Sequence, residues 1–219
     1  MTEPGFSQIA HYRTQLGRLK TIRVKHDLIG RQGEIALILQ RHLLSIARER
    51  HLRVLDIGAY DKAFGRALAR HNPDFTYHSV DVDSSNEHEY HDIRDVNGTY
   101  DAICMFELIE HLALPEAIEL LRRAYSLLNP GGRMFISTPN PDHPTRYFSD
   151  VTHKQPWPAG DLYAVLRGLG FSRTHVEMYG VIYTPPNLSR LLLMELRHIM
   201  WHFIGIERRG GILAIATKG

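Results

Sequence analysis

The stretch that decides the fold reads Val54-Leu-Asp-Ile-Gly-Ala-Tyr-Asp-Lys-Ala-Phe-Gly65. An apolar run ends in a carboxylate and a glycine, and the helical pattern Gly65-Arg-Ala-Leu-Ala-Arg follows directly. This order predicts a strand, a tight loop and a helix. Such a loop places backbone N–H groups and a helix N-terminus at the carboxyl end of a parallel strand, where open α/β sheets bind nucleotide-like ligands. We therefore predict a cofactor site at this loop.

The segments on either side of this stretch alternate between strand and helix patterns. Further strands are predicted over 75–81, 88–93, 100–106, 133–140, 171–183 and 211–218, and helices over 34–50, 65–71, 115–128 and 159–169. Strands that alternate with helices are typical of a doubly wound sheet. We predict an α/β fold with a mostly parallel, seven-stranded sheet that carries helices on both faces.

Composition narrows the class of protein. The 219 residues are 43% hydrophobic and 23% charged, which suits one globular domain. A net charge of +2 is too small to indicate nucleic acid as a partner. The single cysteine, Cys104, lies in an apolar run, as expected of a buried thiol in a reducing compartment. With no signal-peptide pattern and no apolar run long enough to span a membrane, a cytoplasmic location is predicted.

Two regions flank or interrupt the predicted domain, which we place at residues 34–219. Residues 1–33 are polar and basic, and we expect a solvated leader, with a lid that supplies cations to an acidic substrate as the alternative. Residues 187–206 form a helical insertion before the last strand. Its apolar side chains recur at helical spacing, which favours core packing, with a homodimer face or a hold on a lipid-like substrate as alternatives. The apolar positions of this insertion include Leu188, Leu191, Leu192, Leu196, Ile199, Met200, Phe203 and Ile204.

A second carboxylate supports the cofactor site. Asp81 ends the predicted strand 75–81 and follows Asp56 by the length of a strand–helix–strand unit. At this spacing an acidic side chain can accept hydrogen bonds from the two hydroxyl groups of a ribose.

The motifs in this order resemble those of the class I S-adenosylmethionine-dependent methyltransferase superfamily. The similarity is to the group that includes ubiquinone-biosynthesis O-methyltransferases and many small-molecule and glycan methyltransferases. The motifs are Val54-Leu-Asp-Ile-Gly, Asp81, Asp92-Ile93, Phe106-Glu-Leu-Ile-Glu-His-Leu, Leu128-Asn-Pro-Gly-Gly-Arg and Ile136-Ser-Thr-Pro-Asn. The resemblance implies S-adenosylmethionine as cofactor and an acceptor that is a small molecule or is linked to a sugar or lipid.

The resemblance also implies a set of cofactor-binding residues. By this resemblance, Gly58 and Ala59 would contact the methionyl part of the cofactor, and Asp81 would bind the ribose. Val82, Asp92 and Ile93 would contact the adenine, and Phe106 would line the far side of the cofactor. Asp56 and Tyr60, in the loop itself, complete the set.

The loop departs from the family pattern at two positions. Tyr60 and Lys62 stand where glycines allow close backbone approach and positive φ angles. Keeping such a dihedral angle at Tyr60 costs on the order of 1 kcal/mol. Lys62 adds bulk and a positive charge, which would repel the sulfonium of the cofactor. Either the loop is rebuilt, with the Tyr60 ring covering the cofactor, or cofactor binding is lost and the chain is a non-catalytic, methyltransferase-like binding protein.

Three histidines are candidates for a general base, which methyl transfer needs only when the acceptor must lose a proton. They are His111, His143 and His153. We favour His153 first, because it lies in the long proline-rich loop 139–158 that we expect to form a wall of the site, and His111 second.

The group Glu107, Glu110, His111 and His153 offers an alternative chemistry. Two carboxylates and two imidazoles can bind a divalent metal, and the group resembles that of metal-dependent RNA 2′-O-methyltransferases. The short motif is weakly specific, and the small net charge argues against RNA. We therefore predict no metal and keep this as the third function.

Overall fold

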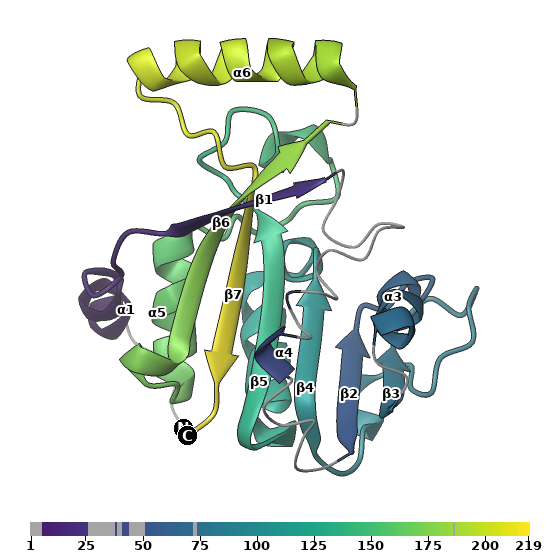
Figure 1. Ribbon diagram of the computed structural model, residues 1–219. Coiled ribbons are helices and arrows are strands. Elements are labelled where there is room, and N and C mark those ends of the chain that lie inside the picture. The colour runs from purple at the N-terminus through teal and green to yellow at the C-terminus, as the bar shows by residue number, and fades with distance from the viewer. Residues whose placement is uncertain (1–5, 26–37, 39–40, 44–50, 72–73, 186) are drawn as a thin grey trace.

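The computed structural model describes residues 6–25, 38, 41–43, 51–71, 74–185 and 187–219 (Figure 1). Seven strands form one sheet in the order β1-β6-β7-β5-β4-β2-β3. The strands are β1 (Lys20–Lys25), β2 (Leu52–Ile57), β3 (Phe75–Val80), β4 (Tyr100–Phe106), β5 (Leu128–Pro139), β6 (Val176–Thr184) and β7 (Gly211–Thr217). The strands β3, β2, β4 and β5 pair in parallel, β1 pairs in parallel with β6, and β7 runs antiparallel between β5 and β6. The predicted α/β class and mostly parallel seven-stranded sheet are confirmed.

Helices cover both faces of this sheet. They are α1 (Phe6–Arg13), α3 (Ala63–His71), α4 (Leu114–Leu127), α5 (Ala159–Leu169) and α6 (Leu188–Phe203), with short 3₁₀ turns η1 (Ile93–Asp95), η2 (Ile109–His111), η3 (Tyr147–Ser149) and η4 (Arg173–His175). Of the helix predicted over 34–50, residues 38 and 41–43 are helical and the others lie outside the described residues. Helix α5 ends at Gly170, whose φ of 115° allows the left-handed cap that stops a helix.

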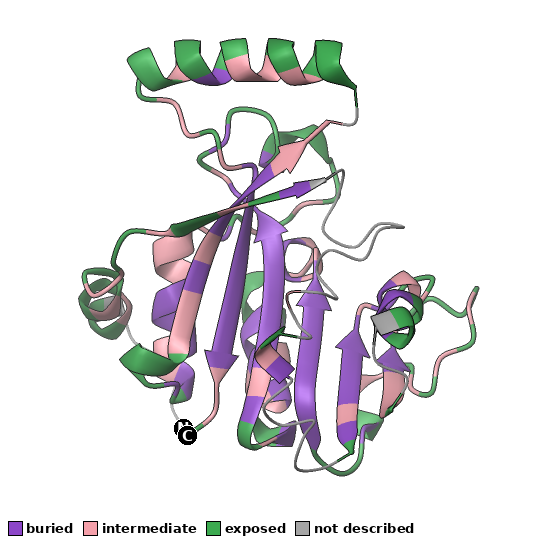
Figure 2. Cartoon of the chain, in the orientation of Figure 1, coloured by how far each residue is buried: buried purple, intermediate pink, exposed green. Residues whose placement is uncertain are grey.

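One apolar cluster lies on each face of the sheet, because alternate residues of a strand point to opposite sides. On β4, Ile103 and Met105 belong to the cluster beneath α4 and α5, whereas Cys104 and Phe106 belong to the cluster beneath α3. The strands at the centre of the sheet are buried along nearly their whole length (Figure 2). The sheet therefore forms a rigid base for the loops at the carboxyl ends of its parallel strands.

The N-terminal region differs from the prediction. Residues 20–25, expected in a solvated leader, form the edge strand β1, in register with Tyr179 to Thr184 of β6. Helix α1 packs on α5, and Arg13 forms an ion pair with Asp161. The polar composition concealed the strand, because an edge strand buries few of its side chains. The domain boundary predicted between residues 33 and 34 lies outside the described residues. Residues 92–93, predicted as a strand, lead instead into η1, which Asp92 caps through the backbone N–H of Arg94.

Helix α6 also differs from the prediction of core packing. It lies across the end of the sheet toward which the parallel strands point (Figure 1), and of its residues only His198 is buried. The apolar side chains of its outer face are between 55% and 82% exposed. A helical pattern shows that apolar residues share a face but not what covers that face, so the homodimer stays a prediction. Among the helices of the described ranges, none is both long and apolar enough to cross a membrane.

Candidate functional site

The loop from β2 to α3 holds three left-handed residues at alternate positions. The φ angles are 73° at Gly58, 45° at Tyr60 and 58° at Lys62. Tyr60 and Lys62 therefore adopt a backbone conformation that glycine adopts without strain.

Backbone hydrogen bonds close this loop against the end of β3. The N–H of Gly58 donates to the Val80 carbonyl at 2.8 Å, and the N–H of Tyr60 donates to Oδ2 of Asp81 at 2.7 Å. The N–H of Lys62 donates to the Ala59 carbonyl at 2.7 Å. These bonds hold the strained residues in place, as surroundings must do wherever such dihedral angles persist.

A cavity of about 660 Å³ opens beside the loop, between the ends of β2 and β3, η1 and one face of α4. Its volume lies in the range of small-molecule sites. Glycine is favoured at position 58 by its left-handed φ of 73°, and a Cβ there would also lie 2.9 Å from Cδ1 of Leu108 on the opposite wall. The lining residues are Ile57, Gly58, Val80, Asp81, Val82, His91, Asp92, Ile93, Arg94, Leu108, Leu112, Glu116, Glu119, Leu120 and Arg123.

Five of the predicted cofactor residues line this cavity: Gly58, Asp81, Val82, Asp92 and Ile93. Asp81 accepts the N–H of Asp83 at 2.9 Å as well as that of Tyr60. Asp92 accepts hydrogen bonds from the backbone and the guanidinium of Arg94, which lower the pKa of Asp92 to about 2. A ligand that uses the Asp92 carboxylate must therefore share it with Arg94.

The other predicted cofactor residues lie outside the cavity lining. Asp56 is buried and accepts the Tyr77 hydroxyl at 2.6 Å; burial raises its pKa to about 7. Ala59 is buried, and the Tyr60 side chain is 68% exposed. The Phe106 ring packs edge-on against Phe64 with 5.0 Å between ring centroids, on the α3 side of the sheet.

The Lys62 ammonium does not line the cavity. Its Nζ lies 3.8 Å from Oε1 of Glu89, whose other oxygen accepts two hydrogen bonds from Ser79. The Glu89 carboxylate beside β3 thus pairs with the Lys62 ammonium. This is the charge that we expected, from the sequence, to repel a cationic cofactor.

Sequence reasoning missed the wall that α4 contributes. Glu119 and Leu120 lie three and four residues after Glu116, and Arg123 lies four and three residues after them, so the four side chains share one face of the helix. Arg123 also donates to the Val96 carbonyl at 2.7 Å, which fixes the segment after η1 against α4. The spacing of these residues was the signal that could have identified this wall.

A second group of polar side chains follows β4 directly. Ligand atoms of Glu110, His111 and His153 all lie within 4.8 Å of one another. Nδ1 of His153 lies 2.6 Å from the Tyr147 carbonyl, and Nδ1 of His111 lies 2.9 Å from the Thr152 hydroxyl. The structure thus brings together the two favoured histidines and one of the two predicted glutamates.

Of the two predicted glutamates, Glu110 is buried and Glu107 is partly buried. The Glu110 oxygens are buried without a hydrogen-bond partner among the described residues, and burial, followed by the charge of Glu107, raises the pKa of Glu110 to about 8. Burial also raises the pKa of Glu107, whose Oε1 accepts the Ser137 hydroxyl at 2.7 Å. Glu107 lies outside the group of three and holds a left-handed φ of 49°.

His143, the third histidine candidate, lies in a different pocket, between loop 140–149 and α6. Its Nδ1 accepts the backbone N–H of Thr145 at 3.3 Å. Burial, followed by the charge of Arg146, lowers the pKa of His143 to about 4.

Comparison with known proteins identifies related sequences. A family model described as a methyltransferase domain matches residues 29–178. Ubiquinone biosynthesis O-methyltransferases from Xanthomonas campestris pv. campestris (strain B100) and Xanthomonas axonopodis pv. citri are 29% and 30% identical over 105 residues. Each match covers 40% of this chain and 43% of the relative, so the chain spans less than half of these curated relatives.

Solved structures share the fold at low sequence identity. A SAM-dependent methyltransferase from Archaeoglobus fulgidus aligns with a TM-score of 0.61 and 18% identity, over 84% of this chain and 94% of that one. The magnesium protoporphyrin IX methyltransferase of Synechocystis, solved with bound SAM, aligns with a TM-score of 0.54 and 13% identity, over 98% and 92%.

The left-handed backbone at Lys62 predicts an unusual order of stability. Lys62→Gly should be more stable than Lys62→Ala by about 0.5 to 1 kcal/mol, because glycine removes the strain at some cost in unfolded-chain entropy. At Arg66, in helix α3, the order should reverse, since glycine is the weaker helix former by about 1 kcal/mol. Urea unfolding of the four variants measures both differences. Equal stability of the two Lys62 variants would contradict the left-handed conformation.

Burial of Asp56 predicts a pH-dependent stability. The folded protein keeps the Asp56 proton up to a pKa of about 7, whereas the unfolded chain releases it near 3.8. The contribution of Asp56 to stability should therefore fall as pH rises between these values, by about 1.4 kcal/mol per pKa unit at most. Asp56→Asn keeps an acceptor for Tyr77 and should gain stability over wild type as pH rises from 4 to 7. Unfolding across that range measures the gain, with the exposed Glu87→Gln as control; a constant difference rejects the shifted pKa.

Proposed function

Because the chain belongs to the methyltransferase-domain family, we propose that it transfers a methyl group from S-adenosylmethionine to a small-molecule or sugar- or lipid-linked acceptor. The methyltransferase family predicted from the sequence is confirmed by the family match. The bound SAM in the magnesium protoporphyrin IX methyltransferase, which has the same fold, supports S-adenosylmethionine as the cofactor. The cavity beside Gly58 and Asp81 carries the proposal for this chain, since it lies at the carboxyl ends of two parallel strands.

Asp81 is suited to a ribose. A carboxylate has about four lone-pair positions, and the N–H groups of Tyr60 and Asp83 use two of them. The remaining positions can accept two ribose hydroxyls, while the two backbone bonds fix the direction of the carboxylate. Leu108, Leu112 and Leu120 supply the apolar surface that an adenine or a thioether chain needs.

The loop supports cofactor binding despite its two substitutions. The left-handed dihedral angles persist, the Tyr60 ring lies outside the cavity lining, and Lys62 is turned toward Glu89. Because neither substituted side chain lines the cavity, the loop favours the enzyme over the non-catalytic alternative.

The cofactor supplies an electrophilic methyl group, so the chain must align the acceptor with it and exclude water. The segment 107–112 contributes to both sites. Leu108 and Leu112 line the cofactor cavity, and Glu110 and His111 belong to the adjacent cluster. An acceptor bound over this cluster would therefore lie beside the cofactor cavity.

His153 is the base of this proposal. A carbonyl oxygen only accepts hydrogen bonds, so the contact with Tyr147 requires the proton on Nδ1 and leaves a lone pair on Nε2 of the neutral ring. That Nε2 can take the proton of an acceptor hydroxyl. The His111 ring, with its centroid 4.8 Å from that of His153, forms the neighbouring wall.

One observation favours a second candidate, metal-assisted transfer. A buried carboxylate without a hydrogen-bond partner, as at Glu110, is costly unless it is protonated or binds a cation. Two imidazoles lie within reach, and the Nδ1 contact of His153 with a carbonyl is the kind that orients metal-binding histidines. The donor set of Glu110, His111 and His153 fits a divalent transition-metal ion, which would polarise the acceptor oxygen.

Cofactor binding is tested by calorimetric titration with S-adenosylmethionine and S-adenosylhomocysteine. Both should bind, and Asp81→Asn should weaken binding by about tenfold or more, since a hydrogen bond to a charged group contributes roughly 1.5 to 3 kcal/mol. Asp83→Asn, an exposed neighbour outside the cavity, serves as the matched control. Absence of binding at millimolar cofactor would reject the proposed function.

The base and the metal are separated by nitrogen NMR of the histidine rings. We expect the His153 ring to carry its proton on Nδ1, and Zn²⁺ to leave its signals unchanged. A Zn²⁺-dependent shift at His111 and His153, lost in Glu110→Gln and absent at the exposed His51, would establish the metal instead. A proton on Nε2 of His153 without any metal effect would contradict both roles.

A further inference from the structure

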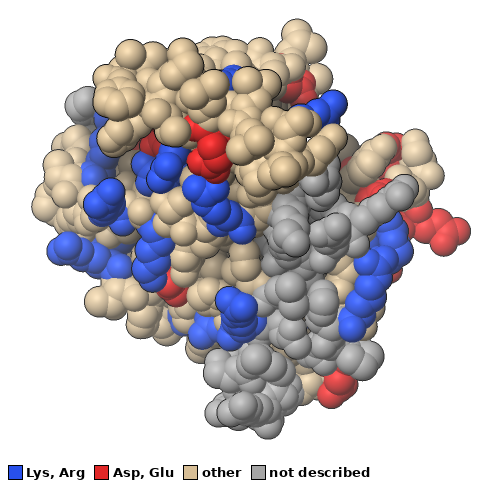
Figure 3. All heavy atoms as spheres, turned by 45° about the horizontal axis from the view of Figure 1, so that its top comes forward, with Lys and Arg blue, Asp and Glu red and all other residues tan. Residues whose placement is uncertain are grey.

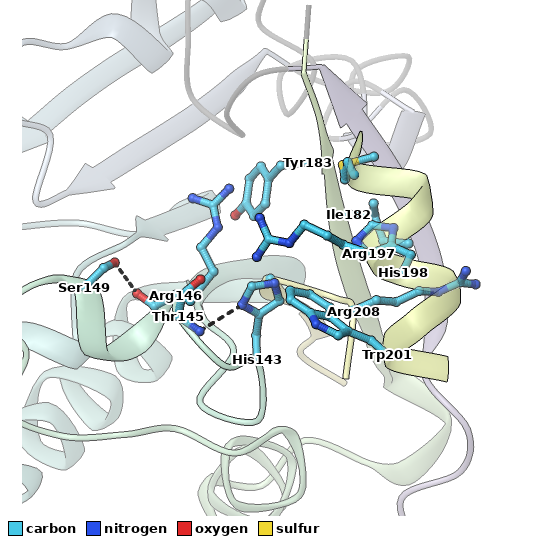
Figure 4. A pocket seen from close by; sticks show the side chains of 12 residues that line it. His143, Thr145, Arg146, Ser149, Ile182, Tyr183, Arg197, His198, Trp201 and Arg208 are labelled. Carbon is cyan, nitrogen blue, oxygen red and sulfur yellow. Dashed lines mark hydrogen bonds between the residues drawn. The ribbon is translucent and has the colours of Figure 1, made fainter. Parts of the chain in front are cut away.

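A second pocket shares no lining residue with the cofactor cavity. It has a volume of about 340 Å³ and is lined by residues of the segment 143–149, the end of β6, Arg208 and Gly210 before β7, and α6. In the view of Figure 3, lysine and arginine side chains gather below the largely uncharged surface of α6. Figure 4 shows side chains from the loop and from α6 facing each other across the pocket.

The charge in this pocket has one sign. Arg146, Arg197 and Arg208 line it together with His143 and His198, and no lining residue is acidic. Within the part of the chain that the structure describes, none of these three arginines lies within 4.0 Å of a carboxylate.

Arginines just outside the pocket behave differently. Arg209 forms an ion pair with Glu207, and Arg23 pairs with Glu195 at 2.8 Å. Carboxylates are thus available nearby but pair with the arginines that do not line the pocket. The pocket keeps its positive charge available for a ligand.

Aromatic rings hold two of the guanidinium groups in place. The Arg146 guanidinium lies 4.3 Å from the centroid of the Tyr183 ring, and that of Arg197 lies 4.8 Å from the Trp201 ring. Stacking of this kind orients the planar group and leaves its N–H edge free to bind.

Two glycines lie against this stacked pair. A Cβ at Gly210 would lie 3.1 Å from Cγ and Nε of Arg146, so Arg146 would have to shift by a few tenths of an ångström. A Cβ at Gly211, the first residue of β7, would lie 2.5 Å from the Tyr183 hydroxyl. The backbone at the start of β7 is therefore in close contact with the stacked pair.

Two buried histidines add neutral donors at the base of the pocket. Nδ1 of His143 accepts the N–H of Thr145, so Nε2 carries the proton and can donate it. His198 is 5% exposed, and its Nδ1 is buried with no hydrogen-bond partner in the described ranges. A buried polar atom without a partner is uncommon and marks a place that a ligand can satisfy.

We propose that this pocket binds a phosphate or pyrophosphate group carried by the methyl acceptor. Three guanidinium groups suit more than one negative charge, and their forked N–H groups match phosphate oxygens. Carboxylate ligands carry a single charge and would leave part of this set unpaired.

The position of the pocket connects it to the reaction, and in this respect the inference rests on the proposed function. Tyr147 follows Arg146 directly in the chain. The Tyr147 carbonyl accepts a hydrogen bond from Nδ1 of His153, and the centroids of the Tyr147 and His153 rings lie 5.1 Å apart. A phosphate held by Arg146 would thus anchor the acceptor one residue from the segment that orients the base. The remainder of the acceptor would extend toward the cluster of Glu110, His111 and His153.

Calorimetric titration of the full chain with inorganic pyrophosphate tests the proposal. Wild type should bind, and Arg146→Gln and Arg197→Gln should each weaken binding by about tenfold. Arg66→Gln, an exposed arginine of α3 paired with Asp61, is the matched control and should bind as wild type does. Unchanged binding of S-adenosylmethionine would show that the variants are folded. Absence of pyrophosphate binding at millimolar concentration, or equal binding by all variants, overturns the phosphate site.

A second arm distinguishes a lipid-linked phosphate from a soluble one. Phosphatidylcholine vesicles with and without phosphatidic acid are sedimented with the protein, because the exposed apolar face of α6 adjoins the pocket. Retention that requires phosphatidic acid, is displaced by pyrophosphate and is lost in Arg146→Gln supports a lipid-linked phosphate; pyrophosphate binding without retention supports a soluble one. Loss of cofactor binding alone would reject the methyltransferase proposal and leave this site standing.

Discussion

The hydrogen bond from the Tyr60 backbone to Asp81 is the contact on which the cofactor cavity depends. It joins the loop after β2 to the end of β3, and it determines both the path of the loop and the direction of the carboxylate. Tyr60 donates this bond from a left-handed conformation, so releasing the strain would also release Asp81. Strain at such a position persists only where the surroundings hold it. Here the sheet supplies that support, since β2 and β3 are paired along their whole length.

The segment after β4 extends this arrangement to the chemistry. Glu107 turns the chain out of the sheet through a left-handed residue, and hydrogen bonds to Ser137 of β5 hold that turn. Leu108 can then reach the cavity while Glu110 and His111 reach the cluster. The indole N–H of Trp157 donates a hydrogen bond to the Ile109 carbonyl and so holds the middle of this segment. One short stretch of backbone thus contributes residues to both sites.

The sequence predicted what depends on local pattern. Buried strands, Gly170 as a helix stop, and Gly58 with Asp81 at the cavity follow from apolar runs, turn residues and spacing. The structure departs from prediction where the outcome depends on distant partners. Strand β1 needs β6 beside it to form, and Phe106 points away from the cavity because the alternation along β4 fixes its side. The arginines of the second pocket come from three segments whose meeting no local pattern records.

Helix α6 shows why the second pocket and the apolar surface belong together. Helix α6 contributes Arg197 and His198 to the pocket and exposes leucines on its outer face. Turning that apolar face onto the sheet would carry Arg197 out of the pocket, since the two sets of side chains lie on different faces of one helix. The observed orientation of α6 therefore places a cationic pocket beside an exposed apolar surface, a combination that suits an acceptor with both a phosphate and a hydrocarbon chain.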